Sequence, residues 1–289
     1  MEKILVTGST GHLGTNVIKT LLTKILPQQI NVISRSEEKL TELKAQDVNT
    51  FVASYADIDS LEKAMDGVDT VLLISSDDQG DRMREHKNVI DVAKKMSVKS
   101  IAYTSRSLHD RNTLANNLMV EHFQSEDYIK ASGLKYTFFR NILYMDAIPQ
   151  FIGGKVALEK GIFLPAGDGK VAFALRSEMG EAMSNVLLTE DCNNGIYNFT
   201  GNTIYSFYDI AAALTELSGK EVKYTNVDEM AFKEMMKQRN VPEPAIQKIT
   251  DFITDIRNNQ EADIYNDLEN KLGRKTASLK DGLKFLFEL

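Results

Sequence analysis

The amino-acid sequence predicts an α/β protein built on a doubly wound parallel sheet. Short apolar segments alternate with helical patterns over the first 140 residues. The segment at 69–76 is nearly continuous in apolar side chains, as are strands buried on both faces of a parallel sheet. A glycine-rich turn at residues 8–14 joins the first apolar segment directly to a helical pattern. Together these observations predict a dinucleotide-binding (Rossmann) fold.

Six strands are expected in the amino-terminal part of the chain, at 3–8, 30–35, 48–54, 69–76, 100–105 and 135–140. Helical patterns separate them, at 12–25, 36–46, 58–67, 84–97 and 116–133. Because parallel strands need a crossover connection, this alternation indicates βαβ units with helices on both faces of one sheet. Residues 1–145 are therefore predicted to form the dinucleotide-binding domain.

The pattern becomes less regular after residue 141, where a smaller α/β lobe is expected over the carboxyl edge of the sheet. A strand-like segment at 195–201 is expected to return and join the sheet of the first domain. The other features of this part are glycine-rich segments at 151–155 and 165–170 and helical patterns at 207–219 and 229–239. Residues 146–289 are therefore predicted to form a substrate lobe.

Composition and charge disfavour several classes of protein. Hydrophobic residues make up 43% and charged residues 26% of the 289 residues, which is ordinary for a globular protein. The formal net charge of −7 argues against a nucleic-acid partner. Cys192 is the single cysteine, so neither an internal disulfide nor a paired-cysteine metal site is expected, and Cys192 is given no role. No apolar run approaches the ~20 residues of a membrane-spanning helix and no signal peptide is evident, so a cytoplasmic location is expected.

The three glycines of the amino-terminal turn suit a pyrophosphate group. Gly8 can adopt the positive φ of a tight turn. Gly11 lacks a Cβ, so the backbone can approach a phosphate, and Gly14 lets the following helix pack closely on the strand. The N–H groups of the first helical turn then point at the anion. The alternative is a glycine-rich turn without a ligand.

The end of the second expected strand distinguishes between the two nicotinamide cofactors. An acidic residue there would bind the ribose 2′-hydroxyl of NAD, whereas this sequence has Arg35, with Lys39 one turn later. A guanidinium suits a 2′-phosphate, so NADP(H) is the predicted cofactor. The alternative is a solvated arginine at the start of a helix.

Several motifs resemble those of the NmrA-like family of atypical short-chain dehydrogenases, and most of all the type-2 NADPH:quinone oxidoreductases. These motifs are VTGSTGHLGTNVI (6–18), SRSEEK (34–39), VLLISS (71–76), HKNVIDVAKKMSVKSIAYTS (86–105), SGLKYTFFRN (132–141) and GDGKVA (167–172). The resemblance implies a Rossmann fold, NADPH as cofactor and a quinone as substrate.

The resemblance also implies roles for matching residues, which lie where this fold binds ligands, at the carboxyl ends of the strands. The pyrophosphate and ribose of the cofactor would contact Thr10, Gly11, His12 and Leu13, and its 2′-phosphate would contact Arg35 and Lys39. Ser75 and Ser76 would lie against the cofactor, and Thr104 and Ser105 would lie near the nicotinamide ribose. Asn141 and Tyr144 would face the substrate cleft. Tyr55 and Asp57 would contact the adenine, although Ser54 stands where relatives often carry an acidic residue.

The catalytic Tyr-x-x-x-Lys pair of most short-chain dehydrogenases is absent, because no tyrosine has a lysine four residues later. This absence disfavours a nucleotide-sugar epimerase. Some reductases of the wider group keep a catalytic lysine on the helix before SGLKYT, and His122 occupies that place. Since the pKa of histidine is ordinarily near neutral, His122 could donate a proton or orient the nicotinamide ribose. The alternative is a structural role within the helix.

Structural roles are expected for three other side chains. His86 is interpreted as a packing or capping residue, His109 as part of a solvated loop, and Asp168 as a residue that shapes a turn.

Hydride transfer from NADPH to a quinone or similar small electrophile is the favoured function. A quinone accepts hydride without strong acid assistance, so the protein needs mainly to place its ring beside the nicotinamide. Tyr144 could offer a ring surface together with Phe138, Phe139 and Phe151, although some of these phenylalanines must be core.

A non-enzymatic NADP(H)-binding regulator with a protein partner is the alternative, and an epimerase-like protein is a weaker one. An open pocket beside the nicotinamide would favour the enzyme, and a blocked one the regulator. The sequence leaves a homodimer and a regulatory complex both open.

Overall fold

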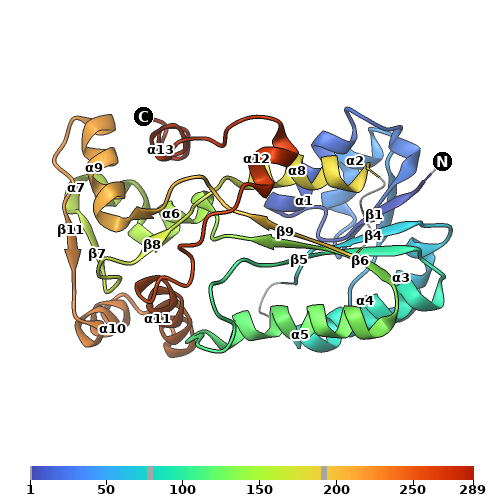
Figure 1. The fold of residues 1–289 in the computed structure, drawn as a ribbon, viewed down its shortest axis with the longest axis horizontal. Coiled ribbons are helices and arrows are strands. Elements are labelled where there is room, and N and C mark those ends of the chain that lie inside the picture. Colours follow the sequence, from blue (N-terminus) through green and yellow to red (C-terminus); the bar gives the residue numbers. More distant parts are fainter. Residues whose placement is uncertain (1, 77–80, 190–193) are drawn as a thin grey trace.

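The computed structural model describes residues 2–76, 81–189 and 194–289. Its centre is a seven-stranded parallel sheet with the strand order β3-β2-β1-β4-β5-β6-β9 (Figure 1). The strands are β1 (Ile4–Val6), β2 (Ile30–Ser34), β3 (Asn49–Val52), β4 (Thr70–Leu73), β5 (Ser100–Arg106), β6 (Lys135–Asn141) and β9 (Gly195–Phe199). The strand order reverses between β1 and β4, which confirms the predicted doubly wound fold class.

Helices cover both faces of this sheet (Figure 1). On one face lie α1 (His12–Leu21), α2 (Thr41–Lys44), α8 (Arg176–Leu187) and α12 (Asp267–Leu272), and on the other α3 (Ile58–Met65), α4 (Arg82–Lys95) and α5 (Asn117–Ser132). Along β1, Ile4 and Val6 join the apolar core under α1, whereas Leu5 joins the core under α3 and α4. Burial on both faces explains why these strands are continuously apolar in sequence.

The smaller lobe lies beyond the carboxyl ends of the strands, at the left of Figure 1. It contains two small sheets, in which β8 (Lys170–Val171) is antiparallel to β10 (Tyr205–Ser206) and β7 (Ile162–Leu164) is parallel to β11 (Tyr224–Asn226). Its helices are α6 (Ile148–Ile152), α7 (Ala157–Lys160), α9 (Phe207–Ser218), α10 (Glu229–Gln238), α11 (Glu243–Arg257) and α13 (Leu279–Phe287). Short 3₁₀ turns occur at Pro27–Gln29, Glu38–Leu40, Met145–Ala147 and Gly154–Val156.

The chain after residue 145 contributes to the sheet layer as well as to the lobe. β9 pairs in parallel with β6, with Thr137 opposite Gly195 and Asn141 opposite Phe199. α8 packs directly on α1, where a Cβ on Gly180 would lie 2.7 Å from the Cβ of Asn16. The expected substrate lobe at 146–289 is thus continuous with the dinucleotide-binding layer.

Two elements differ from the sequence-based expectation. The helix expected at 36–46 is a 3₁₀ turn followed by the single turn of α2. The helix expected at 84–97 begins earlier, at Arg82, because the side chain of Asp81 accepts a hydrogen bond from the backbone N–H of Arg84 and caps it.

Within the three described ranges, no helix combines the length and apolar character needed to cross a bilayer. The same residues contain no group of three or more His, Cys, Asp or Glu side chains placed to hold a metal ion. Cys192 lies outside the described residues.

Candidate functional site

The glycine turn between β1 and α1 forms a tight cradle. Gly8 has φ +57°, and its carbonyl oxygen accepts a hydrogen bond of 3.0 Å from the N–H of Gly11. A Cβ on Gly14 would lie 2.3 Å from the same oxygen, so no larger residue fits there without moving the backbone. Glycine at Gly8 and Gly14 is therefore required by the shape of the turn.

The amino-terminal end of α1 has three features that suit an anion. Gly11 is the N-cap residue, no side chain caps the helix, and no acidic residue lies in its first turn. The first N–H groups of the helix and its dipole therefore remain directed at any ligand above the turn. His12 is exposed beside them, Thr10 is half-buried, and Leu13 is buried in the core.

Arg35 and Lys39 lie beside this turn. β2 is parallel to β1, with Val32 opposite Val6, so Arg35 follows the strand end next to the glycines. The hydroxyls of Thr10 and Ser34 are 3.5 Å apart and connect the two strand ends. Both cationic side chains are exposed, and contact of either with a phosphate stays a prediction.

The two residues expected to contact adenine are already hydrogen-bonded within the protein. The Tyr55 hydroxyl lies 2.5 Å from the Thr7 hydroxyl and donates to the carbonyl oxygen of Ile74 at 2.8 Å. Asp57 caps α3 by accepting a bond of 3.2 Å from the N–H of Ser60. Contact of either residue with adenine stays a prediction.

Four buried polar atoms lack a partner at the carboxyl ends of neighbouring strands. They are the hydroxyl oxygens of Ser76 and Ser105, the Nε of Arg106 and the side-chain oxygen of Asn141, none bonded to any described residue. Thr104 is already engaged, because its hydroxyl accepts a bond of 2.8 Å from the N–H of Ser75. Since buried polar groups are normally hydrogen-bonded, these free atoms are candidates to bind a polar ligand at the ends of β4, β5 and β6, and that contact stays a prediction.

His122 is buried on α5 and faces the side of β5 that α5 covers. Its Nδ1 lies 2.9 Å from the Tyr103 hydroxyl. Burial, followed by the positive charges of Arg82 and Arg106, holds the pKa of His122 well below its usual value, so the imidazole is neutral. His122 is not among the residues that line the substrate-sized pocket at the boundary between sheet and lobe. A direct role of His122 in catalysis therefore stays a prediction.

His86 is buried in the same layer. Its Nε2 accepts a bond of 3.1 Å from the N–H of Ser76, and its Nδ1 lies 2.8 Å from the Ser125 hydroxyl. Burial lowers the pKa of His86 to about 3, with a smaller contribution from the charge of Arg82. His86 thus holds the end of β4 in place as a neutral imidazole.

These two neutral histidines should make the fold sensitive to acid. The unfolded chain protonates both near pH 6.5, whereas the folded chain does not, so lowering the pH favours the unfolded state. We expect the free energy of unfolding to fall by about 2 kcal/mol per histidine between pH 7 and pH 5. Urea denaturation at the two pH values measures this loss.

Single variants separate the two contributions. His86→Gln and His122→Gln should each reduce the pH dependence by about 2 kcal/mol, whatever their absolute stability. His12→Gln is the control, because the His12 side chain is exposed. An identical pH dependence in all four proteins would show that the buried histidines are not kept neutral.

Asn141 and Tyr144 lie together at the end of β6. The side-chain N–H of Asn141 donates to the Tyr144 hydroxyl at 3.3 Å. The guanidinium of Arg176, the first residue of α8, lies 4.3 Å from the centre of the Tyr144 ring. This contact fixes the ring at the boundary between the sheet and the lobe.

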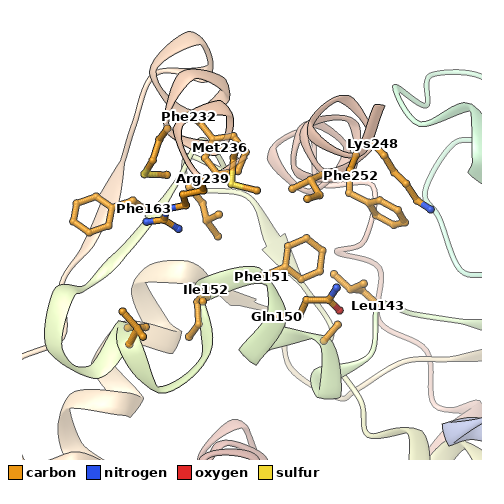
Figure 2. A pocket seen from close by; sticks show the side chains of 18 of the residues that line it. Leu143, Gln150, Phe151, Ile152, Phe163, Phe232, Met236, Arg239, Lys248 and Phe252 are labelled. Carbon is orange, nitrogen blue, oxygen red and sulfur yellow. The ribbon is translucent and has the colours of Figure 1, made fainter. Parts of the chain in front are cut away.

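A pocket of about 990 Å³ opens at this boundary (Figure 2). Arg106, Leu143, Tyr144 and Arg176 form its wall toward the sheet. Phe151 lies opposite Phe252, with ring centres 6.5 Å apart and planes at 72°. Its volume and mixed apolar and polar lining suit one small aromatic molecule.

Other candidates lie away from this pocket. Phe138 and Phe139 are fully buried in the core, so of the three phenylalanines weighed with Tyr144 only Phe151 lines the pocket. His109 is exposed and bonds to Asp263. Asp168 is exposed in the turn before β8.

The helices that close the far side of the pocket carry lining residues that no sequence motif marked. α10 and the residue that follows it contribute Phe232, Met235, Met236 and Arg239, and α11 contributes Ala245, Lys248, Ile249 and Phe252. Both sets have the spacing i, i+3, i+4, i+7 of a single helix face. That spacing is visible in the sequence, but the same pattern is typical of a helix packed on a core.

Known proteins resemble this chain over nearly all of its length. Quinone oxidoreductase 2 of Escherichia coli (strain K12) is 34% identical over 287 residues, which cover 99% of each chain. The solved structure of an NADPH-dependent quinone oxidoreductase of Escherichia coli with NADPH matches with a TM-score of 0.90 and 33% identity, covering 98% of this chain and 99% of the other. The structure of Citrobacter sp. triphenylmethane reductase with NADP(H) matches with a TM-score of 0.92 and 32% identity at the same coverage.

The family comparison agrees with the glycine cradle and the strand order. The model of the NmrA-like family matches residues 1–286, almost the whole chain. The chain belongs to the NmrA-like family.

Proposed function

We propose that this chain binds NADPH and transfers hydride from it to a quinone or a related flat electrophile. The observation that carries the proposal is the aromatic pocket, which opens where Arg106 and Leu143 lie at the ends of β5 and β6. In this fold the nicotinamide end of a dinucleotide lies outside the carboxyl ends of the strands. The similarity to quinone oxidoreductase of Escherichia coli, in sequence and in structure, supports the same assignment.

The cofactor would lie along the carboxyl edge of the sheet. The N–H groups after Gly11 would bind the pyrophosphate, and Arg35 and Lys39 would bind the 2′-phosphate. The unpartnered hydroxyls of Ser76 and Ser105 would gain hydrogen bonds from the ligand. Bound NADPH supplies the hydride, and the protein supplies position and a dry surface.

The substrate would lie against Tyr144. Its ring is held by the Arg176 guanidinium, and its hydroxyl is held by Asn141. From there the Tyr144 hydroxyl can donate a hydrogen bond to a quinone carbonyl as negative charge develops on that oxygen. The hydroquinone monoanion left by hydride addition would then take a proton from water that enters through the open side of the pocket.

A regulator that only senses NADP(H) would not need this pocket. Its lining includes aromatic side chains and methionines, against which a flat hydride acceptor can lie. The pocket therefore favours the enzyme over the regulator, and the missing Tyr-x-x-x-Lys pair agrees with an acceptor that needs little acid assistance.

Oxidation of NADPH at 340 nm with a panel of quinones tests the proposal. We expect turnover with NADPH and a much lower kcat/KM with NADH. Arg35→Ala should raise the KM for NADPH about tenfold, since it removes a charge-assisted hydrogen bond to the 2′-phosphate, and should leave the KM for NADH unchanged. Lys44→Ala removes an exposed charge at the far end of α2 and serves as the matched control.

Two results would overturn the assignment. Tight binding of NADPH without its oxidation by any quinone would favour a non-enzymatic regulator instead. Equal kcat/KM with NADPH and NADH in the unmodified protein would show that Arg35 does not select the 2′-phosphate.

A further inference from the structure

Every charged residue that lines the pocket within the described part of the chain is a cation. The five are Arg106, Lys160, Arg176, Arg239 and Lys248. The whole chain has the opposite balance, with 41 acidic and 34 basic residues. The positive lining is therefore a local feature of the pocket and does not follow from the average composition.

Ion pairs offset part of this charge, at the end of the pocket nearest the sheet. Arg106 pairs with the buried Glu261, and a side-chain nitrogen of Arg176 lies 3.9 Å from Asp146. Within the described ranges, Arg239 and Lys160 form no ion pair. Both are exposed at the rim. The uncompensated charge is therefore at the outer part of the pocket.

Arg239 adjoins the apolar wall. It follows α10 on the face that carries Phe232 and Met236, and Figure 2 draws all three among the side chains that line the pocket. An aromatic ring held in this pocket would thus have a cation in the surrounding wall. A low-dielectric wall strengthens the attraction of such a cation for an anion.

We infer that the preferred substrate is a flat aromatic acceptor that carries an anionic substituent, such as a carboxylate or sulfonate. The ring lies against Tyr144 and the apolar walls, and the anion points outward to Arg239, with Lys160 adding positive potential at the rim. This inference rests on the proposed function, because it names the substrate class of the same site.

A matched pair of quinones tests the inference. One is a 1,4-naphthoquinone with a propanoate side chain, and the other is its methyl ester, which has the same ring without the charge. We expect the unmodified protein to prefer the acid in kcat/KM. Arg239→Gln should lower kcat/KM for the acid about threefold and leave the ester unchanged, and Lys160→Gln with Arg239→Gln should lower it about tenfold. Lys237→Gln is the control, since Lys237 is exposed on α10 but does not line the pocket.

Equilibrium binding tests the anion-binding pocket without depending on turnover. 8-Anilinonaphthalene-1-sulfonate and the uncharged N-phenyl-1-naphthylamine are fluorescent probes that differ by one sulfonate. Arg239→Gln should weaken binding of the sulfonate probe alone, whereas Met236→Ala should weaken binding of both probes. If no quinone is reduced but this pattern holds, the proposed function fails and the anion-binding pocket stands. If Arg239→Gln changes neither the acid-to-ester ratio nor the binding of the sulfonate probe, the inference is wrong.

Discussion

Replacing Gly14 with alanine is expected to lower the affinity for NADPH at least about a hundredfold. The added Cβ would lie 2.3 Å from the carbonyl oxygen of Gly8 and 2.9 Å from the Cα of Ser9. Both are backbone atoms, so the turn or the start of α1 must move by roughly 1 Å, away from the position that binds the pyrophosphate. Loss of two hydrogen bonds to the charged pyrophosphate, at about 1.5 kcal/mol each, corresponds to about a hundredfold in affinity. Titration of the purified variant with NADPH, followed by calorimetry, measures the loss.

Two further glycine variants separate binding from stability. Gly67 has φ +65°, and a Cβ added there would have no neighbour within 4 Å, so Gly67→Ala should cost about 1–2 kcal/mol of stability and leave NADPH binding intact. Gly11 has φ −85°, which any residue adopts, and a Cβ there would lie 3.3 Å from the carbonyl oxygen of Gly8. Gly11→Ala should therefore fold with only a small shift of the turn and lose affinity mainly because its methyl group meets the ligand. Binding by Gly14→Ala that equals the unmodified protein would show that this turn does not hold the pyrophosphate.

The cradle could be predicted because all of its determinants are local in sequence. Gly8, Gly11 and Gly14 lie within one turn between a strand and a helix, where the backbone leaves little room for a side chain. The strand order follows from the alternation of strands and helices, which restricts a parallel sheet to few topologies. Arg35 follows directly from the end of the second strand.

The pocket could not be predicted in the same way, because its walls come from distant parts of the chain. α10 and α11 carry helix faces whose spacing is readable, but only tertiary packing brings Phe252 opposite Phe151. Burial of His122 against Tyr103 is likewise a product of packing, since the helix pattern of residues 116–133 does not show which face carries the histidine inward. Glu261 meets Arg106 across 155 residues of sequence, a distance that no local pattern spans.

Loss of the ion pair between Arg106 and Glu261 should have the second large effect, on stability. Replacing Arg106 with methionine is expected to lower the free energy of unfolding by about 3–5 kcal/mol, as measured by urea denaturation. Both side chains of the pair are buried, and the other carboxylate oxygen of Glu261 accepts a bond of 3.0 Å from the N–H of Leu143. Without the guanidinium, a buried carboxylate is left with little compensation.

Removing both charges should be much less harmful than removing one. Arg106→Met with Glu261→Gln leaves no unpaired ion, so its stability should lie closer to that of the unmodified protein. The exposed pair of Arg111 and Asp127, 3.0 Å apart, is the matched control, and Arg111→Met should cost less than about 1 kcal/mol. A loss in Arg106→Met no larger than in Arg111→Met would contradict the assigned role of the pair.

Acid should partly rescue the single Arg106 variant. Burial raises the pKa of Glu261 even beside Arg106, and removal of that cation raises it further. A carboxyl group whose pKa is higher in the folded chain binds more protons when folded, so stability rises as the pH falls toward the unfolded value near 4.3. The deficit of Arg106→Met relative to the unmodified protein should therefore shrink between pH 7 and pH 5, whereas the double variant has no carboxyl group at position 261 and should show no such rescue. Because the pair joins the end of β5 to the segment after α11, the same rescue would show that the unpaired carboxylate at this junction causes the loss.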